Sequence, residues 1–258
     1  MLFRSASRDD TLPMLTAICL DIDGESITLA ATDRYRLAVR ELGWEPARPG
    51  LRAIALVPAR TLADAARTMV PGEPVPVAFT PADEPSPGRD PHPVDGMISF
   101  ECRGRRLTGR LIGGEFIRYR SRFPDGYGCR AEMPAGSFIE AVRRVSLVAD
   151  RASPVRLTFG QGQVVVEAQT EGRARAAEAV AASFEGDEPA IAFNPHYLLD
   201  GLTAAAAGSA PVAALARGSC LTGGGLVLAP GRRSLGPGIQ GPRTLPRLIT
   251  FPYRYRRD

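Results

Sequence analysis

The chain has 258 residues and a formal charge of +4, and all of its 32 basic residues are arginine. This length fits one large domain or two ordinary ones, and the small positive excess permits a polyanionic partner without requiring one. No apolar run approaches the roughly 18 to 20 residues that span a bilayer, and residues 1–10 are too polar for a signal peptide. We therefore expect a cytoplasmic protein with no membrane partner.

The residues that usually carry chemistry are sparse. The four cysteines Cys19, Cys102, Cys129 and Cys220 are far apart in the sequence and form no C-x-x-C pair, so neither a zinc site nor a disulfide framework is predicted. A phosphate-binding loop needs a lysine, and the chain has none. No serine or cysteine has an evident base beside it. We expect no catalytic residue, no metal and no cofactor, and hence a binding protein and not an enzyme.

Three short strands are predicted between Leu15 and Val39. The first begins at Leu15 and ends at a turn at residues 23–24, and the second covers residues 27–31. After a turn at residues 32–33, the third places Tyr35, Leu37 and Val39 on one face. This block is the unit around which the rest of the chain is organised.

A strand at residues 53–57 then leads through Pro58 into a helix at residues 58–69. Proline is tolerated in the first turn of a helix, where its missing N–H costs nothing. Apolar spacing places one face of this helix inward, comprising Leu62, Ala65, Ala66 and Met69. Arg60 and Arg67 are predicted on the opposite face.

The next segments predict a second, smaller sheet. Residues 75–79 alternate as a strand, residues 81–95 form a surface loop, and strands at 97–102 and 106–112 make a hairpin around Arg103-Gly104. An irregular basic and aromatic segment covers residues 113–124.

The same block recurs in the second half of the chain. Thr32 corresponds to Thr170 at an offset of 138 positions, and the strand running into Pro58 corresponds to the one running into Pro195 at an offset of 137. Two landmarks with nearly one offset indicate two copies of one α+β module. Chance likeness between strand-rich sequences is the alternative.

The two copies differ at their ends. The second is preceded by a helix at residues 134–149, with apolar positions at Phe138, Ile139, Val142, Val145 and Leu147. The first copy has no room for that helix, so we expect it to be incomplete. Beyond residue 202 the sequence is rich in Gly, Pro and Arg, with weak strands at 212–215 and 226–228. Residues 251–258 could be an edge strand or a loose basic tail.

Four segments, in order along residues 8–202, closely resemble the bacterial sliding clamp, the beta subunit of DNA polymerase III. They are Thr11-Leu-Pro-Met-Leu15, Leu29-Ala-Ala-Thr-Asp-Arg-Tyr-Arg-Leu-Ala-Val39, Gly114-Glu-Phe-Ile-Arg-Tyr-Arg-Ser-Arg-Phe-Pro124 and Phe193-Asn-Pro-His-Tyr-Leu-Leu-Asp200. The resemblance implies an α+β fold of tandem clamp modules, each with two helices packed on antiparallel sheets. Residues 1–132 resemble the family's central domain, incomplete at its start, and 133–258 its C-terminal domain, degraded after about residue 203.

The resemblance also implies a processivity factor for DNA replication that tethers polymerase to duplex DNA. Clamp helices line the hole of a ring, so the arginines expected to face phosphate are Arg60, Arg67, Arg143 and Arg144. Such contacts are sequence-independent and weaken with salt. Ordinary solvated helix faces are the alternative for each of them.

A second implied site is a groove that takes a short apolar and aromatic peptide from polymerases, the clamp loader and other clamp-binding proteins. By resemblance it would comprise Leu15, Thr32, Arg34, Tyr35, Arg36, Leu37, Ile117, Ser121, Arg122, Asn194 and Tyr197. Leu15, Leu37 and Tyr197 would form apolar wall, and Thr32, Arg36 and Asn194 would bond the peptide backbone. Plain core and turn is the alternative.

Three departures from the family pattern predict a weakened groove. Ile117 stands where similar sequences usually have proline, and Arg122 where an apolar residue is usual. The Met-Pro-x-Arg-Leu strand that floors the groove is not recognisable in residues 251–258. A charge beside an apolar pocket costs affinity unless it reaches water.

Two other functions stay open. The chain could be a decoy that binds replication partners without loading on DNA, or the non-functional product of a disrupted gene. As a homo-oligomer, three two-module chains could supply six modules to a ring.

Overall fold

The computed structural model describes residues 2–81, 96–123, 129–150, 153–160, 162–170, 173–186, 190–206, 212–216, 226–230 and 247–250. The chain divides into two compact units, Leu2–Arg120 and Ser121–Asp258. The module boundary predicted after residue 132 falls inside the second unit. Of the loop predicted at 81–95, Pro81 instead ends a strand, and the remaining residues lie outside the described residues, as do residues 251–258.

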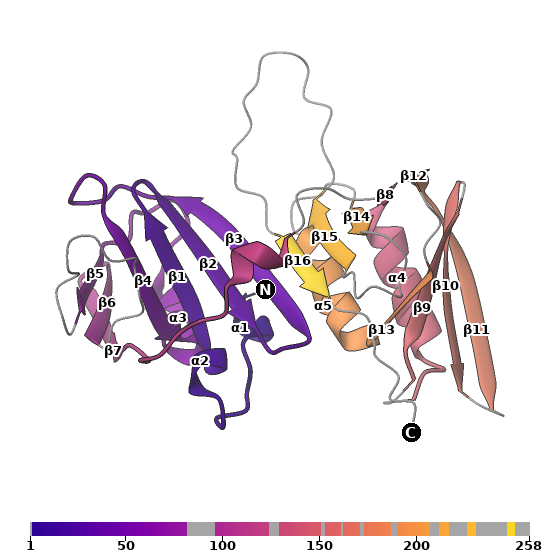
Figure 1. The fold of residues 1–258 in the computed structure, drawn as a ribbon, viewed down its shortest axis with the longest axis horizontal. Helices are drawn as coiled ribbons and strands as arrows, with labels where there is room; N and C mark the ends of the chain where they lie inside the picture. Colours follow the sequence, from indigo (N-terminus) through magenta and orange to yellow (C-terminus); the bar gives the residue numbers. More distant parts are fainter. Residues whose placement is uncertain are drawn as a thin grey trace, which may run out of the picture. The chain divides into compact units, whose positions relative to one another are not determined.

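The first unit contains a four-stranded antiparallel sheet in the order β3-β2-β1-β4 (Figure 1). Its strands are β1 (Ala17–Asp23), β2 (Ser26–Thr32), β3 (Arg36–Gly43) and β4 (Arg52–Pro58). Because β1 pairs with both β2 and β4, it lies inside the sheet. The three predicted strands of this block are confirmed.

A second antiparallel sheet of the first unit has the order β5-β6-β7. Its strands are β5 (Val77–Pro81), β6 (Gly96–Cys102) and β7 (Arg105–Arg110). The predicted hairpin is confirmed, and its turn residues Arg103 and Gly104 have φ angles of 49° and 71°. Two consecutive positive φ angles suit the twist of a tight hairpin.

The helices of the first unit are α1 (Leu2–Ser5), α2 (Pro13–Thr16) and α3 (Ala59–Thr68). Three local predictions were wrong. Leu15 lies in α2 and not in a strand, because Pro13 opens a short helical turn there. Tyr35 lies in the turn before β3, and Ala66 is exposed because only part of the predicted apolar face of α3 meets the sheets.

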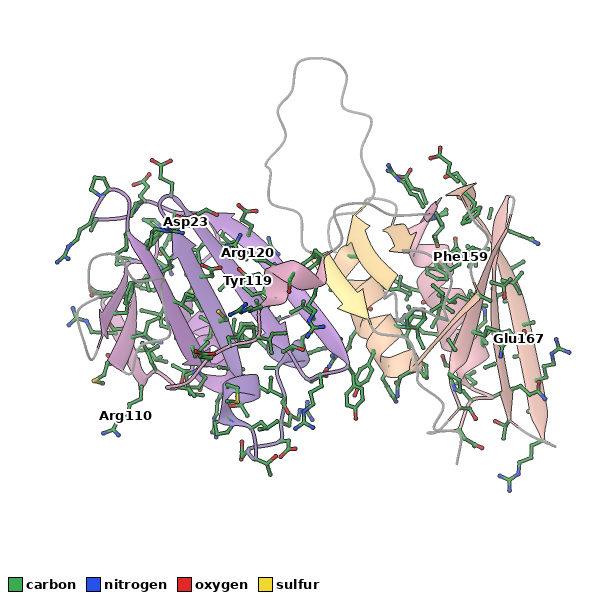
Figure 2. All side chains as sticks on the ribbon, in the orientation of Figure 1. Asp23, Arg110, Tyr119, Arg120, Phe159 and Glu167 are labelled. Carbon is green, nitrogen blue, oxygen red and sulfur yellow. The ribbon has the colours of Figure 1, made fainter. Side chains whose placement is uncertain are left out.

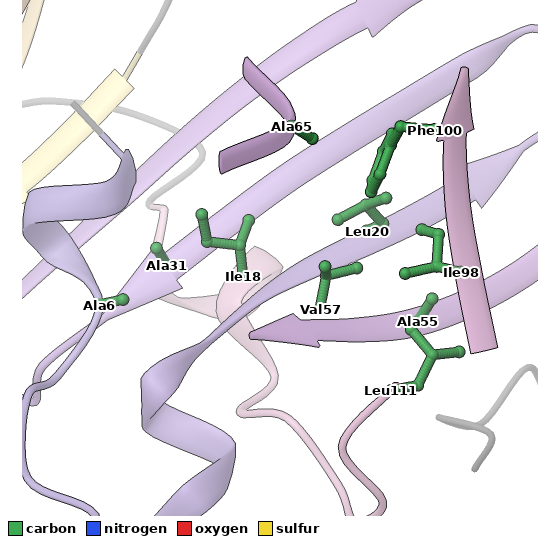
Figure 3. Packing of buried hydrophobic residues seen from close by; sticks show 10 residues of the cluster. All are labelled: Ala6, Ile18, Leu20, Ala31, Ala55, Val57, Ala65, Ile98, Phe100 and Leu111. Atoms are coloured by element: carbon green, nitrogen blue, oxygen red, sulfur yellow. The ribbon is translucent and has the colours of Figure 1, made fainter. Parts of the chain in front are cut away.

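The core of the first unit joins both sheets and α3. Side chains from β1, β4 and β6 pack with Ala65 of α3 and with Leu111 (Figure 3). The cluster consists of Ala6, Ile18, Leu20, Ala31, Ala55, Val57, Ala65, Ile98, Phe100 and Leu111. Removing such apolar area from water is the main favourable term in folding.

The second unit also contains two antiparallel groups of strands, in the orders β11-β10-β9-β13 and β12-β8-β14-β15-β16. The strands are β8 (Cys129–Met133), β9 (Val155–Gly160), β10 (Gln163–Thr170), β11 (Ala174–Ala181), β12 (Ser183–Gly186), β13 (Ala190–Phe193), β14 (Val212–Ala216), β15 (Leu226–Pro230) and β16 (Arg247–Thr250). The weak strands predicted at 212–215 and 226–228 are confirmed, and β16 adds one that the sequence did not predict.

The helices of the second unit are η1 (Tyr119–Arg122, which begins at the end of the first unit), α4 (Ala135–Ser146) and α5 (Pro195–Ala205). Four of the five predicted apolar positions of α4 are buried, namely Phe138, Ile139, Val142 and Val145. Leu147 was predicted inward wrongly, since it follows the last residue of the helix and is 84% exposed.

The predicted duplication is confirmed by topology. The order β3-β2-β1-β4 repeats as β11-β10-β9-β13, and α3 follows β4 as α5 follows β13. The hairpin series β5-β6-β7 likewise repeats as β14-β15-β16. Thr32 and Thr170 end the equivalent strands β2 and β10. The second unit has in addition β8 and α4 ahead of its repeat.

Candidate functional site

Two predicted phosphate-facing arginines lie on α3. Arg60 and Arg67 are both exposed, and their spacing of seven residues places them on one face of the helix. Arg67 Nη1 lies 2.5 Å from Asp64 Oδ1. Among the described residues no carboxylate lies within ion-pair distance of Arg60. Arg60 is therefore the better placed of the two to meet a phosphate.

The other two predicted arginines lie on α4 and are paired with carboxylates. Arg143 Nη1 lies 2.7 Å from Glu140 Oε1. Arg144 donates from Nη2 to Glu178 Oε1 at 2.6 Å and from Nε to Glu178 Oε2 at 3.1 Å. This fork-shaped contact lowers the pKa of Glu178 and raises the pKa of Arg144. A phosphate would have to compete with Glu178 for Arg144.

A tightly bonded turn holds five predicted groove residues in the first unit. Thr32 Oγ1 donates to the carbonyl of Arg36 at 2.7 Å and accepts from the amide of Arg34 at 3.2 Å. Asp33 Oδ1 accepts from the amides of Tyr35 at 3.1 Å and Arg36 at 3.0 Å. Each bond lies within four residues, so the local sequence itself fixes the shape of the turn.

Arg36 is used inside this turn. Its Nε donates to Asp33 Oδ2 at 2.9 Å, and the two side chains are only 8% and 13% exposed. Its guanidinium also donates to the carbonyl of Arg4, at the end of α1. A paired, buried guanidinium contributes to the fold, so a bond from Arg36 to a peptide would require these contacts to change.

Most of the predicted groove residues of the first unit are covered. Leu15, Thr32 and Leu37 are buried, Ile117 is half-buried, and Tyr35 is 60% exposed beside the exposed Arg34. The turn therefore presents an arginine and a tyrosine outward, with its apolar residues beneath. As described, the first unit offers Tyr35 and Arg34 for contact more readily than it offers Leu37.

Four predicted groove residues belong to the second unit. Ser121 and the exposed Arg122 lie in η1, so the charge of Arg122 reaches water. Asn194 caps α5, with its side-chain oxygen accepting from the amide of His196 at 3.0 Å. Tyr197 lies in the first turn of α5. The cap uses the acceptor of Asn194 that was predicted to bond a peptide.

A polar cluster on the face of β1 was missed from the sequence. Tyr119 Oη donates to Asp21 Oδ2 at 2.6 Å, and Arg120 donates to the same oxygen from Nε at 3.1 Å and from Nη2 at 2.8 Å. Figure 2 labels Tyr119 and Arg120 beside this sheet. The signal available was a lone aspartate between the apolar residues Leu20 and Ile22, because a charge on such a strand needs a partner.

The described residues contain neither a metal-binding cluster nor a membrane-spanning helix. No group of three or more His, Cys, Asp or Glu side chains in the described ranges is placed to hold a metal ion. Over the same residues, no helix is long and apolar enough to cross a membrane. Of the two histidines, His196 begins α5, and His92 lies outside the described residues.

Sequence comparison matches both halves of the chain to profiles of one protein. Residues 3–117 match the DNA polymerase III beta subunit, central domain, and residues 120–212 match its C-terminal domain. The beta sliding clamp of Streptomyces coelicolor is 46% identical over 200 residues, which cover 78% of this chain and 51% of that protein. The beta sliding clamp homolog GriR of Streptomyces muensis is 41% identical over 198 residues, 77% of this chain and 50% of that protein.

The fold also matches solved clamps. The Bacillus subtilis DNA polymerase sliding clamp aligns with a TM-score of 0.78 at 20% identity, covering 98% of this chain and 60% of that one. The beta subunit from the DNA polymerase of Streptococcus pyogenes aligns with the same TM-score at 18% identity, covering 98% of this chain and 61% of that one. The chain thus spans about half the length of the relatives that it matches by sequence.

Proposed function

Because this chain belongs to the family of the DNA polymerase III beta subunit, the sliding clamp, we propose that it acts as a clamp that tethers the replicative polymerase to duplex DNA. The observation that carries the proposal is the order of matches, since the family's central and C-terminal domains fall in sequence on the two repeated units. The role is that of a non-catalytic accessory subunit in the cytoplasm.

Contact with DNA would rest on phosphate binding by exposed arginines. Arg60 is the leading contact, because it has no carboxylate partner in the described part of the chain. Arg67, Arg143 and Arg144 each share their charge with a neighbouring carboxylate. Exposed ion pairs of this kind are weak, so a phosphate can exchange with the carboxylate. Binding without base contacts would leave the protein able to move along the duplex.

Retention on DNA tests the clamp directly. The purified protein, with clamp loader and ATP, is applied to closed circular DNA and to the same DNA after linearisation, at 50 and at 200 mM salt. A ring is retained on the circle and lost from linear ends, and its phosphate contacts weaken with salt. Equal loss from both forms would overturn encirclement.

Two substitutions test the arginines. Arg60→Ala should lower the slope of log affinity against log salt by about one, the effect of one lost phosphate contact. Arg110→Ala removes an exposed arginine of the same unit outside the predicted surface and serves as the matched control (Figure 2). Glu178→Gln removes the fork-shaped contact of Arg144, leaves only the longer one to Glu140 Oε2 at 3.9 Å, and should strengthen binding. An unchanged slope with Arg60→Ala would contradict the assignment.

The second activity that we propose is the binding of a short apolar and aromatic peptide from the polymerase or the clamp loader. Its support in the first unit is the rigid turn that presents Arg34 and Tyr35 outward. Tyr35→Ala should weaken the binding of a labelled peptide carrying leucine and phenylalanine. Met97→Ala, which truncates another exposed apolar side chain of this unit, is the control. Ser121, Arg122, Asn194 and Tyr197 remain predicted contacts of the same peptide.

The alternative function is a decoy that binds clamp partners without encircling DNA. The carboxylate pairing of three of the four predicted phosphate contacts favours it. Capture by the peptide without retention on circular DNA would establish the decoy. A molecular mass by light scattering tests the possibility of a ring of three chains, which a monomer would exclude.

A further inference from the structure

The segment that runs from the end of β7 into the first two residues of η1 is tied to the first unit at both of its ends. We call residues 111–120 the strap. At its start, the amide of Leu111 donates to the carbonyl of Gly96 and that of Ile112 to the carbonyl of Leu56, both at 2.8 Å. From there the strap runs past α2 to η1 (Figure 1). Its far end is held by side chains.

The side chains of Tyr119 and Arg120 bind that far end to Asp21 of β1. Tyr119 Oη and two nitrogens of Arg120 all donate to one oxygen of Asp21, at 2.6, 3.1 and 2.8 Å. The Arg120 guanidinium lies 5.5 Å from the centre of the Tyr119 ring, a cation–π distance. The Phe116 ring meets Tyr119 edge to face at 6.5 Å. We call Asp21, Tyr119 and Arg120 the clasp.

Two members of the clasp are covered on the sheet, since Tyr119 is buried and the Asp21 side chain is 16% exposed, whereas Arg120 is exposed. Asp21 pairs across to Thr28 on β2 and to Ile54 on β4, so its strand has neighbours on both sides. The Tyr119 side chain is buried, and burial, followed by the bond to Asp21, raises the pKa of its hydroxyl. The hydroxyl therefore stays protonated and donates at neutral pH. Leaving a covered carboxylate without such donors would cost free energy.

The clasp lies beside one predicted groove residue. Ile117 precedes Tyr119 by two positions, and its carbonyl accepts from the amide of Tyr119 at 2.7 Å. The position of the Ile117 backbone is thus coupled to that of Tyr119. We propose that the clasp positions the strap, and with it Ile117, for peptide binding, an inference that rests on the proposed peptide site.

Positioning of the strap by the clasp should affect the free energy and the rate of peptide binding, and both can be measured. A strap held in place before the peptide arrives loses little further conformational entropy on binding, whereas a loose strap must be ordered at that moment. Loss of the clasp should therefore weaken peptide binding mainly through slower association. A contact made by Tyr119 itself would instead change dissociation.

The experiment combines hydrogen exchange with peptide binding in three variants of the full chain. Tyr119→Phe keeps the ring and removes the hydroxyl, Asp21→Asn keeps an acceptor and removes the charge, and Glu101→Gln makes the same carboxylate-to-amide change in the exposed Glu101–Arg106 pair of this unit. In Tyr119→Phe, exchange of the strap amides should rise about tenfold while β1 and β2 stay protected, which corresponds to one lost hydrogen bond. Asp21→Asn should show a smaller rise, and Glu101→Gln none.

Peptide association, measured with a labelled peptide carrying leucine and phenylalanine, completes the test. The expected result is slower association in Tyr119→Phe, in step with strap exchange. Unchanged strap exchange in Tyr119→Phe overturns the clasp. Faster exchange with unchanged association overturns its positioning role. If the unsubstituted protein binds no peptide, the proposed peptide site fails, and exchange alone still decides whether the clasp holds the strap.

Discussion

Gly109 on β7 and Thr61 on α3 lie so close that a Cβ added to Gly109 would stand 2.6 Å from Cγ2 of Thr61. Carbon atoms pack favourably at about 3.5 to 4.0 Å, and a threonine in a helix has few rotamers to choose from. The absence of a side chain at Gly109 therefore allows α3 to lie against the smaller sheet. The position of Arg60 and Arg67 depends on this contact.

Gly109→Ala should lower the free energy of unfolding by about 1 to 3 kcal/mol, the usual cost of overpacking. Urea denaturation measures it. Gly136→Ala in α4 is the matched control, because nothing lies within 4 Å of its added Cβ, and it should be neutral or stabilising. Adding Thr61→Ala to Gly109→Ala should restore most of the loss. A single variant as stable as the unsubstituted protein would contradict the close approach.

Replacing Arg34 by glycine should stabilise the protein. Its φ angle of 79° lies in the left-handed region, which costs a residue with a Cβ roughly 1 to 2 kcal/mol. Glycine avoids this cost but loses more conformational entropy on folding, which offsets part of the benefit. Arg34→Gly should therefore raise the free energy of unfolding by about 0.5 to 1 kcal/mol. Arg34→Ala keeps the Cβ and should give no such gain in the same denaturation assay. Equal gains in both variants would rule out backbone strain as the cause.

Most of the fold could be predicted because the sequence contains two copies of the same module. The strand and proline landmarks of the two halves are local features, and the sheet orders β3-β2-β1-β4 and β11-β10-β9-β13 follow from them. Periodicity failed where burial depends on neighbours. Ala66 and Leu147 continue an apolar spacing, yet no element of the described structure covers them.

Less of the site could be predicted, because the resemblance to the clamp family indicates which positions belong to a site but not which contacts their side chains make. It placed Arg36 and Asn194 in a groove, and the structure shows one in a buried ion pair and the other capping a helix. The clasp escaped prediction because 98 positions separate Asp21 from Tyr119. No local pattern joins residues so far apart.

Phe138 tests whether the two units unfold separately. Its side chain on α4 is fully buried in the second unit, so Phe138→Ala should cost that unit about 3 to 5 kcal/mol. Hydrogen exchange resolved along the chain should show faster exchange in β9, β10 and α4, with β1 and β2 of the first unit unchanged. Equal loss of protection in both units would show that they unfold as one.

The protein should lose stability at alkaline pH through two covered groups on one face of β1. Burial raises the pKa of the Cys19 thiol from 9.0 to about 12, and burial with the bond to Asp21 raises that of the Tyr119 hydroxyl above 10.0. Both groups are neutral when protonated, and burial in the folded protein disfavours their charged forms. The unfolded chain therefore releases these protons at lower pH than the folded one. The stabilisation is complete below pH 9 and is lost as the pH rises towards 12.

Urea denaturation between pH 8 and 11 measures this loss. While only the unfolded thiol is ionised, Cys19 contributes a fall of at most about 1.4 kcal/mol per pH unit. Cys19→Ala should flatten the alkaline slope, and adding Tyr119→Phe should flatten it further. Cys102→Ala truncates another buried cysteine, on β6, and controls for lost packing. An alkaline slope unaltered in the double variant would show that other groups cause the loss, because removing both acids removes their protons from the linkage.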